Sequence, residues 1–330
     1  MKESKTFYLP KLVTFYTENQ AVREPVGFSR SPMKPYLLMN KIEGETFSKY
    51  FEVQDNFPPF SEEDFQIAHE EEYVKDFFDG ISPAAGSNGL TWTPEFAETV
   101  KYTNSSLYHA QKYAVENPNC ITFSPTSGFH HAIPEEGDRF CTFSGQVISA
   151  IKLYREKDIC TAWIDMDGHD GNSIEESRDF LPELEIAIPE ICNLNPRVKG
   201  RMSYLKNLSE GLDVIANEVL DGRIHSICFA QGADSHSDDE LAPPTTSVGT
   251  QDWVEAHRMV FQKVKEISEK MGKPIPLTIS LFGGYRDDDY ESVLNLHCMN
   301  LISCLEILCG VDLKFGLEDS GERILLARLK

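Results

Sequence analysis

The sequence predicts an α/β fold in which a mainly parallel, multi-stranded sheet is covered by helices on both faces. Short apolar segments rich in β-branched and aromatic residues alternate with longer amphipathic segments, which is the pattern of successive βαβ units. The chain has 330 residues, of which 41% are hydrophobic and 25% charged, so it is globular and can bury a large core. Since no repeat or low-complexity tract interrupts the pattern, we predict a single domain over residues 1–330.

The predicted strands are short apolar runs bounded by turn-forming residues. The five clearest runs cover residues 12–16, 120–124, 159–165, 226–230 and 277–282. Residues 183–188 are a further candidate strand. In a parallel sheet of this kind, ligands bind beyond the carboxyl ends of the strands, so the polar residues that follow these runs are the candidates for a site.

Helices are predicted in the gaps between the strands. Ser61 is a candidate N-cap followed by an acidic first turn, and Thr93 is a candidate N-cap followed by Pro94 at the first helical position. Helical periodicity also covers residues 142–154, 202–219, 252–271 and 290–308. The segments rich in Pro, Gly and Ser, which we predict to be surface loops near the site, are 82–89 and 242–249.

Metal-ligating residue types follow two of the predicted strands. In an extended segment side chains alternate, so Asp165, Asp167 and His169 share one face. With Asp234, which follows the run 226–230, Asp167 and His169 give three protein ligands and an open position, the layout of a catalytic zinc site. Oxygen-rich ligation also admits Fe²⁺, Mn²⁺ or Co²⁺. Each segment alone is equally compatible with an ordinary polar turn after a strand.

Two further segments supply the groups that a metal-activated water needs for amide hydrolysis. The adjacent His130 and His131 offer a general base with a pKa near neutrality, and Asp165 and Asn172 are available to orient the two rings. Tyr285 follows two glycines that allow close approach of the backbone, and its hydroxyl can donate to an oxyanion. Taken singly, these residues are also compatible with ordinary buried or surface histidines and a turn tyrosine.

Charge and cysteine usage limit the partners and the compartment. The formal net charge of −22 repels phosphate backbones, so we expect no direct nucleic-acid binding, whereas cationic amines or lysine-rich peptides would be attracted. Eight cysteines without a C-x-x-C pair are expected to be reduced core thiols. The N-terminal stretch resembles neither a signal peptide nor a membrane span, so we predict a cytoplasmic protein without a membrane partner.

The four site segments, around His130–His131, Asp165–His169, Asp234 and Tyr285, follow one another along the chain in an order that resembles the zinc-dependent histone deacetylase family of the arginase-deacetylase superfamily. The resemblance is to class II-like and acetylpolyamine amidohydrolase-like bacterial deacetylases, and it implies a single-domain arginase-deacetylase fold. Its individual motifs are weak, but their combination is specific and extends over most of the chain. The matching segments are residues 33–35, 61–65, 127–154, 165–172, 232–235, 239 and 283–285.

The resemblance also implies a role for each site residue. Zinc would polarise the acyl carbonyl and a water, and His131 would take the proton of this water and later give it to the departing amine. Tyr285 would hold the substrate carbonyl. Asp167, His169 and Asp234 would bind the zinc. His130 would give electrostatic support, and Asp165 would orient His130 and help to form a structural K⁺ site. Asn172 would orient His131.

The substrate channel departs from the family pattern. The resemblance implies that Phe140 is a channel wall and that Arg139, Phe282 and Gly283 lie beside it. Arg139 replaces a usual glycine, and Phe282 replaces the glutamate with which polyamine-type relatives select cations. Ala242 also replaces a glycine, and no second aromatic wall is evident between residues 172 and 234.

We therefore predict a metal-dependent hydrolase of an N-acyl, most simply acetyl, amide. The expected substrate is an acylated small-molecule amine or an acyl-lysine peptide, and the oligomeric state is left open. A binuclear-manganese ureohydrolase is one alternative, although the sequence lacks the Asp-Ala-His-x-Asp run of that class. A non-catalytic protein that binds acyl-amines in the same pocket is the other.

Overall fold

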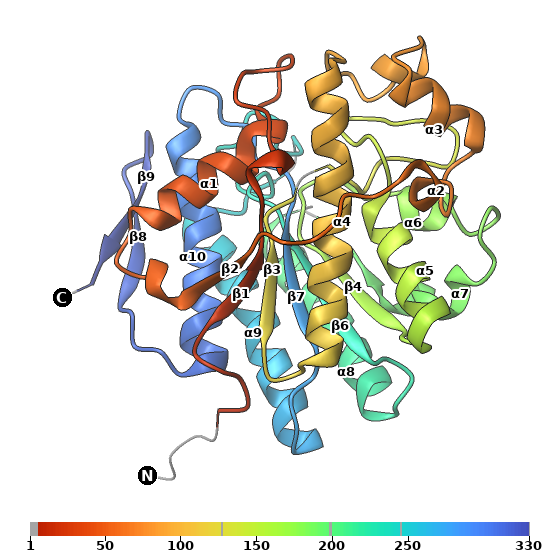
Figure 1. Ribbon diagram of the computed structural model, residues 1–330. Coiled ribbons are helices and arrows are strands. Elements are labelled where there is room, and N and C mark those ends of the chain that lie inside the picture. The colour runs from red at the N-terminus through yellow and green to blue at the C-terminus, as the bar shows by residue number, and fades with distance from the viewer. Residues whose placement is uncertain (1–5, 127, 198–199, 245, 330) are drawn as a thin grey trace.

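Seven strands form one parallel sheet at the centre of the molecule (Figure 1). The computed structural model describes residues 6–126, 128–197, 200–244 and 246–329; Ser127 of the predicted site segment and Thr245 of the predicted loop lie outside them. The strand order is β2-β1-β3-β7-β6-β4-β5. The strands are β1 (Leu12–Phe15), β2 (Phe51–Gln54), β3 (Ile121–Ser124), β4 (Thr161–Asp165), β5 (Asn193–Leu194), β6 (Ser226–Gln231) and β7 (Leu277–Leu281). The predicted parallel α/β sheet is thus confirmed.

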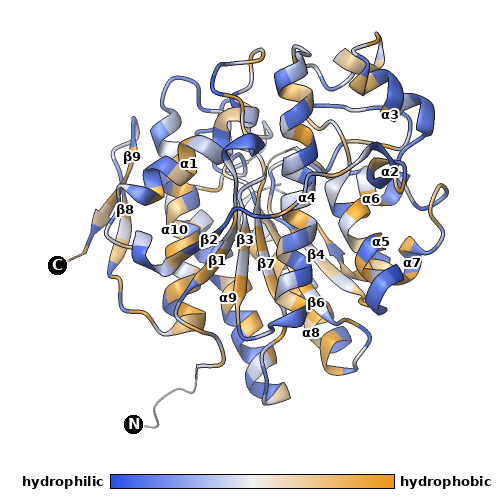
Figure 2. Cartoon of the chain, viewed as in Figure 1, coloured by the Kyte–Doolittle hydropathy of each residue, from blue (hydrophilic) through white to orange (hydrophobic). Residues whose placement is uncertain are grey.

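Helices cover both faces of this sheet, as predicted. Along β6, Ile227 and Phe229 pack toward α1, α8, α9 and α10, whereas Cys228 and Ala230 pack toward α4 and α5 on the opposite face. Figure 2 shows the resulting apolar sheet between helices with more polar outer surfaces. The helices are α1 (Lys34–Glu43), α2 (Glu62–Phe65), α3 (Glu71–Phe78), α4 (Pro94–Glu116), α5 (Gly145–Lys157), α6 (Ser173–Glu176), α7 (Leu184–Ala187), α8 (Arg201–Leu220), α9 (Thr250–Met271) and α10 (Tyr290–Cys309).

The helix start signals in the sequence are confirmed at the atomic level. The Thr93 hydroxyl accepts a hydrogen bond from the Phe96 N–H at 3.0 Å, directly before Pro94 begins α4. At α2, the Asp64 carboxylate accepts the Ser61 N–H at 2.9 Å. Helix α5 begins three residues later than predicted, because the Thr142 hydroxyl accepts a bond from the Asn88 side chain (2.8 Å) within a loop.

The candidate strand at 183–188 is wrong, because this segment contains helix α7 (Leu184–Ala187). Its buried residues Leu184, Ala187 and Ile188 are spaced by three and four positions, which is a helical and not an alternating pattern. The edge of the sheet beside β4 is instead occupied by the two-residue strand β5.

Several short elements gave no clear sequence signal. The edge strand β2 is only partly buried and carries the mixed sequence Phe-Glu-Val-Gln, so it lacks an apolar run. The C-terminal strands β8 (Phe315–Asp319) and β9 (Ile324–Arg328) form an antiparallel hairpin that packs against α10. Short 3₁₀ helices cover Glu18–Gln20, Ser31–Met33, Ser48–Tyr50, Ala84–Gly86 and Glu190–Cys192.

The cysteines and the most apolar helix both lie in the hydrophobic core. All eight cysteines are buried and unpaired, as expected for reduced core thiols. Among the described residues, α10 is long and apolar enough to cross a membrane, but 89% of its apolar window is buried inside the protein. Its composition is therefore that of the central helix of a large core.

Candidate active site

The predicted site residues come together at the carboxyl edge of four neighbouring strands. The sheet order places β3, β7, β6 and β4 side by side. His130 and His131 lie in the loop after β3, Tyr285 lies after β7, and Asp234 lies after β6. The remaining residues, Asp165, Asp167, His169 and Asn172, lie at the end of β4 and in the loop that follows it. The topology thus gathers residues that are up to 155 positions apart in the chain.

Asp167, His169 and Asp234 form a compact group of potential metal ligands. The His169 Nδ1 lies 3.0 Å from Asp167 Oδ1 and 3.0 Å from Asp234 Oδ2. One ligand atom from each of the three residues lies within 4.8 Å of the others. Both carboxylates are buried and the imidazole is partly exposed. Two carboxylate oxygens and an imidazole nitrogen that converge in this way fit a divalent metal with an open position toward solvent.

Backbone amides hold the carboxylates in place. The N–H groups of Gly168 and Gly283 donate to Asp234 Oδ1 (3.0 Å) and Asp167 Oδ2 (2.8 Å), respectively. A Cβ atom at Gly283 would lie 2.1 Å from Asp234 Oδ2 and 2.6 Å from Asp167 Oδ2. Glycine is therefore required at position 283, because any side chain there would occupy the space of the carboxylates.

The two adjacent histidines have different partners and different charges. The His130 Nδ1 lies 2.8 Å from Asp165 Oδ2, and the His131 Nδ1 lies 2.9 Å from Asn172 Oδ1. Burial by itself lowers the pKa of His130, but the carboxylates of Asp167 and Asp165 outweigh it and raise this pKa to about 9. Burial and the positive charge of His130 lower the pKa of His131 to about 3. The pair is therefore one imidazolium and one neutral imidazole at neutral pH.

The hydrogen bond to Asn172 also fixes the tautomer of His131. Because an amide oxygen only accepts, the His131 Nδ1 must carry the proton, and its Nε2 is left as an acceptor. This is the arrangement of a general base. A pKa near neutrality was expected from the sequence, and this expectation is wrong, because burial and the neighbouring imidazolium both disfavour the charged form.

Tyr285 lies on a turn directly after β7, and its backbone N–H donates to Asp239 Oδ2 at 2.7 Å. Burial and the nearby carboxylates of Asp167 and Asp234 raise the pKa of its hydroxyl well above the usual value. The hydroxyl thus stays protonated and can donate a hydrogen bond. The ring centroids of Tyr285 and Phe140 are 5.6 Å apart, so Phe140 lies beside the site as predicted for a channel wall.

The other predicted channel residues differ in their placement. Arg139 lies at the rim with most of its side chain exposed, and its Nε is 3.4 Å from Asp138 Oδ2. The prediction that Phe282 lines the channel is wrong: its side chain is only 1% exposed and packs against the rings of His130 and Trp163. It therefore forms part of the floor under His130, because β7 directs alternate residues toward the α4 face.

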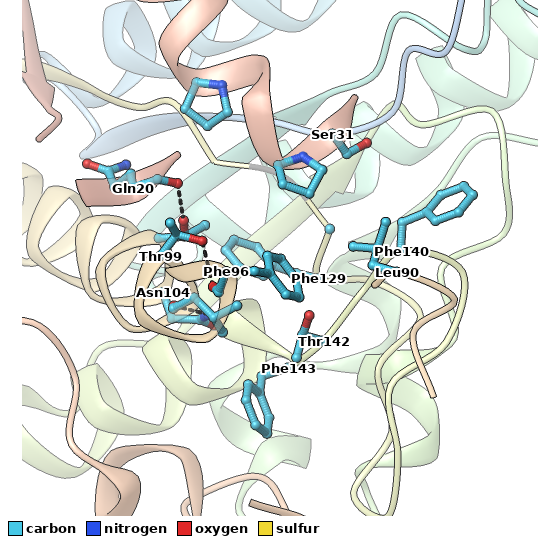
Figure 3. A pocket seen from close by; sticks show the side chains of 15 residues that line it. Gln20, Ser31, Leu90, Phe96, Thr99, Asn104, Phe129, Phe140, Thr142 and Phe143 are labelled. Carbon is cyan, nitrogen blue, oxygen red and sulfur yellow. Dashed lines mark hydrogen bonds between the residues drawn. The ribbon is translucent and has the colours of Figure 1, made fainter. Parts of the chain in front are cut away.

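A separate small pocket, with a cavity volume of about 40 Å³, lies next to the histidine loop (Figure 3). Phe129 stands in the middle of its lining, between Phe96 and Asn104 of α4 and Phe140 on the other side. None of the three potential metal ligands lines this pocket. Sequence reasoning missed it, because its walls come from several segments with no shared pattern.

Two residues that lie close to the site stand out in the sequence only as members of the matching segments. Lys34 is fully buried near the carboxylates of the site, and Asp239 holds the Tyr285 backbone. A lysine between Met33 and Pro35 carries no signal of burial by itself, so only the fold reveals its position. The predicted loop 82–89 does approach the site, since the Asn88 carbonyl accepts the Phe140 N–H at 2.8 Å.

Comparison with known proteins agrees with this site. The model of the histone deacetylase domain matches residues 30–183, which hold every predicted catalytic and metal residue except Asp234 and Tyr285. The crystal structure of the HDA15 HD domain superposes with a TM-score of 0.66 at 12% sequence identity, over 91% of this chain and 89% of that chain. No curated protein gives a significant sequence match.

The fold is that of the arginase-deacetylase superfamily. Within this fold, residues 30–183 match the histone deacetylase domain. This assignment supports hydrolytic deacetylation as the general reaction.

Metal affinity is expected to rise with pH. Hydrogen bonds with Asp167 and Asp234 raise the pKa of metal-free His169 to about 11, and this proton must leave before the imidazole can bind a metal. Below that pKa, the fraction of His169 that is deprotonated rises about tenfold with each unit of pH. The apparent Kd for Zn²⁺ should therefore fall at least about tenfold per unit as the pH rises from 6 to 8. Competition with a chromophoric chelator measures this, and a pH-independent Kd would contradict it.

Proposed function

We propose that the protein is a metal-dependent deacylase that hydrolyses the amide of an N-acyl amine. The observation that carries this proposal is the convergence, around one open position, of three metal-ligating side chains, a neutral histidine and a protonated tyrosine. The histidine and the tyrosine have the protonation states that a general base and an oxyanion donor require.

The ligand set of Asp167, His169 and Asp234 would hold the metal. When bound, a zinc ion supplies a Lewis acid that polarises a carbonyl and makes a water acidic, and Fe²⁺, Mn²⁺ or Co²⁺ also fits this donor set. The second group of potential ligands among the described residues, His236, Asp238 and Asp319, is a different cluster, with Asp238 and Asp319 exposed. A single metal therefore suits the site better than the binuclear centre of a ureohydrolase.

The side chains around the metal site have separate roles in the proposed reaction. The His131 Nε2 is free to take a proton from the attacking water and to return it to the departing amine. The imidazolium of His130, held by Asp165, places a positive charge beside the buried carboxylates. The Tyr285 hydroxyl donates to the oxygen on which negative charge develops.

The substrate is proposed to be an acyl-lysine peptide or a small acylated amine. The net charge of −22 favours the approach of those substrates that keep other, unacylated amines or lysines and so stay cationic. A cytoplasmic location is proposed as well, and eight unpaired cysteines support it. A structural K⁺ near Asp165 stays a proposal based on the resemblance.

The proposed function is tested by metal analysis of the purified protein together with a chelator-sensitive assay. The substrates are fluorogenic acyl-lysines, acetylpolyamines and simple N-acyl amines. We expect one equivalent of divalent metal and chelator-sensitive acyl release. Two equivalents of manganese would favour the ureohydrolase, and a metal-loaded protein inactive on the whole panel would contradict the deacylase.

Tyr285→Phe is expected to lower kcat about 10²-fold to 10³-fold, the range found when a single oxyanion donor is removed. The change removes only the hydroxyl, so the turn and the metal content should be unchanged. Steady-state kinetics and metal analysis of the same preparation check both points. A variant with the kcat of the wild type would show that the hydroxyl does not contact the developing charge.

A further inference from the structure

Lys34 is a buried cation that the proposed mechanism does not use. It is the first residue of α1 and is fully buried, and its Nζ lies 5.7 Å from the centre of the Tyr285 ring. Burial lowers the pKa of this ammonium to about 8, while the carboxylates of Asp234, Asp167 and Asp239 act in the opposite direction. A fully buried lysine is rare in proteins unless it has a partner.

The partner of Lys34 is a backbone carbonyl in the turn that carries Tyr285. The Lys34 Nζ donates to the carbonyl oxygen of Phe282. Because β7 ends at Leu281, this carbonyl lies just beyond the last strand residue. The lysine therefore satisfies a buried acceptor at the point where the chain leaves the sheet.

The rest of this turn is held almost continuously by other hydrogen bonds. The Phe282 N–H donates to the Gln231 carbonyl (2.7 Å), and the Gly283 carbonyl accepts the Ala233 N–H (2.8 Å). The Gly283 N–H is bound by Asp167 and the Tyr285 N–H by Asp239, as described above. Among the described residues, Lys34 and Asp239 are thus the two side chains outside the metal group that hold this turn.

Gly284 joins the anchored part of the turn to Tyr285. It has a φ of 144°, and a Cβ atom there would lie 2.6 Å from Val293 Cγ1 and 3.0 Å from the Ala233 Cβ, so only glycine fits at this position. Because a single residue separates the bonded Gly283 from Tyr285, we expect loss of the anchor at Phe282 to shift the start of Tyr285.

We propose that Lys34 is a positioning residue, which fixes the Phe282–Tyr285 turn through the Phe282 carbonyl and so sets the place of the Tyr285 hydroxyl. This inference rests on the proposed function, in which that hydroxyl donates to the developing oxyanion. A misplacement of about 1 Å at a reacting centre costs on the order of 10²-fold in rate. A buried ammonium at this point also balances part of the charge of Asp167, Asp234 and Asp239.

The test compares Lys34→Met, which removes the donor, with Lys34→Arg, which keeps a charged donor. Lys41→Met is the matched control, because Lys41 lies on the same helix and forms an ion pair with Glu291 of α10 and not with a residue of the Phe282–Tyr285 turn. We expect Lys34→Met to lower kcat by about 30-fold to 100-fold with KM changed less than about threefold. Lys34→Arg should recover at least part of the loss, and Lys41→Met should keep the kcat of the wild type.

A double variant tests whether Lys34 acts through Tyr285. If it does, Lys34→Met should have little further effect on kcat in the Tyr285→Phe background, because the group that it positions is already gone. Losses that multiply in the double variant would overturn the proposal. So would a Lys34→Met variant with the kcat of the wild type.

Hydrogen exchange of the peptide that contains residues 282–287 provides a readout that needs no turnover. We expect exchange of this peptide to be faster by about tenfold in Lys34→Met and unchanged in Lys41→Met, since local opening follows the loss of an anchoring bond. If the wild type proves inactive while this exchange difference is present, the proposed function fails and the structural role of Lys34 holds. Equal exchange in all variants overturns the role itself. Should Lys34→Met not fold, Lys34→Gln takes its place with the same expectations.

Discussion

Asp234→Ala is expected to abolish stoichiometric metal binding and with it all measurable turnover. The substitution removes one of three protein ligands and the acceptor of the Gly168 N–H. The wild type gains about 4 kcal/mol of stability from a metal present at 1,000 times its Kd, and the variant should lose this gain. Thermal unfolding with and without added Zn²⁺ measures the difference.

Without metal, the same variant should be about as stable as the wild type. Asp234 is fully buried next to Asp167, and burial together with that neighbouring charge raises the pKa of its carboxyl to about 7. Removing such a carboxyl relieves repulsion and offsets the lost hydrogen bond. Asp221→Ala is the matched control, because Asp221 is an exposed carboxylate directly after α8 and belongs to neither group of potential ligands. Metal retained by Asp234→Ala at the level of this control would contradict the ligand assignment.

His131→Ala is expected to lower kcat about 10²-fold to 10³-fold while metal content and folding are retained. General bases contribute most when their pKa is near the working pH, and the pKa of His131 lies at about 3. We therefore expect the loss of kcat to stay within this range and not to exceed it. The measurement is kcat at saturating substrate, with metal analysis of the same sample.

A histidine on α4 provides the control for this variant. The ring of His109 contacts Phe57 and Tyr108 and none of the site residues, so His109→Ala should leave kcat unchanged even where it lowers stability. Turnover of His131→Ala at the level of this control would mean that another group accepts the proton.

The sheet and the metal group could be predicted from the sequence because both depend on local patterns. Apolar runs located β1, β3, β4, β6 and β7, and a parallel sheet requires that polar residues after such runs meet at one edge. The alternation of Asp165, Asp167 and His169 is likewise local. The predictions that were wrong concern features that depend on contacts between residues far apart in the chain or on the packing of a segment against its neighbours.

Three cases show this limit. The helix α7 was read as a strand, because six residues of mixed polarity do not distinguish a period of 2 from one of 3.6. Phe282 was placed in the channel by resemblance, yet the strand before it directs its side chain into the core. The pKa of His131 could not be foreseen, since it depends on the charge of His130 and on burial.

Backbone amides hold the proposed metal ligands, and this bears on how the protein acquires its metal. Gly168 and Gly283 fix the carboxylates of Asp234 and Asp167 through bonds that need no ion, so the cradle is complete before any metal arrives. The ion can then exchange without refolding, in contrast to small zinc domains that fold only around their metal. Since a site of this donor type accepts several divalent ions, we expect the cell's pool of free metal to influence which of them the protein carries. The ion found in a purified sample would then report the growth conditions as well as the chemistry of the site.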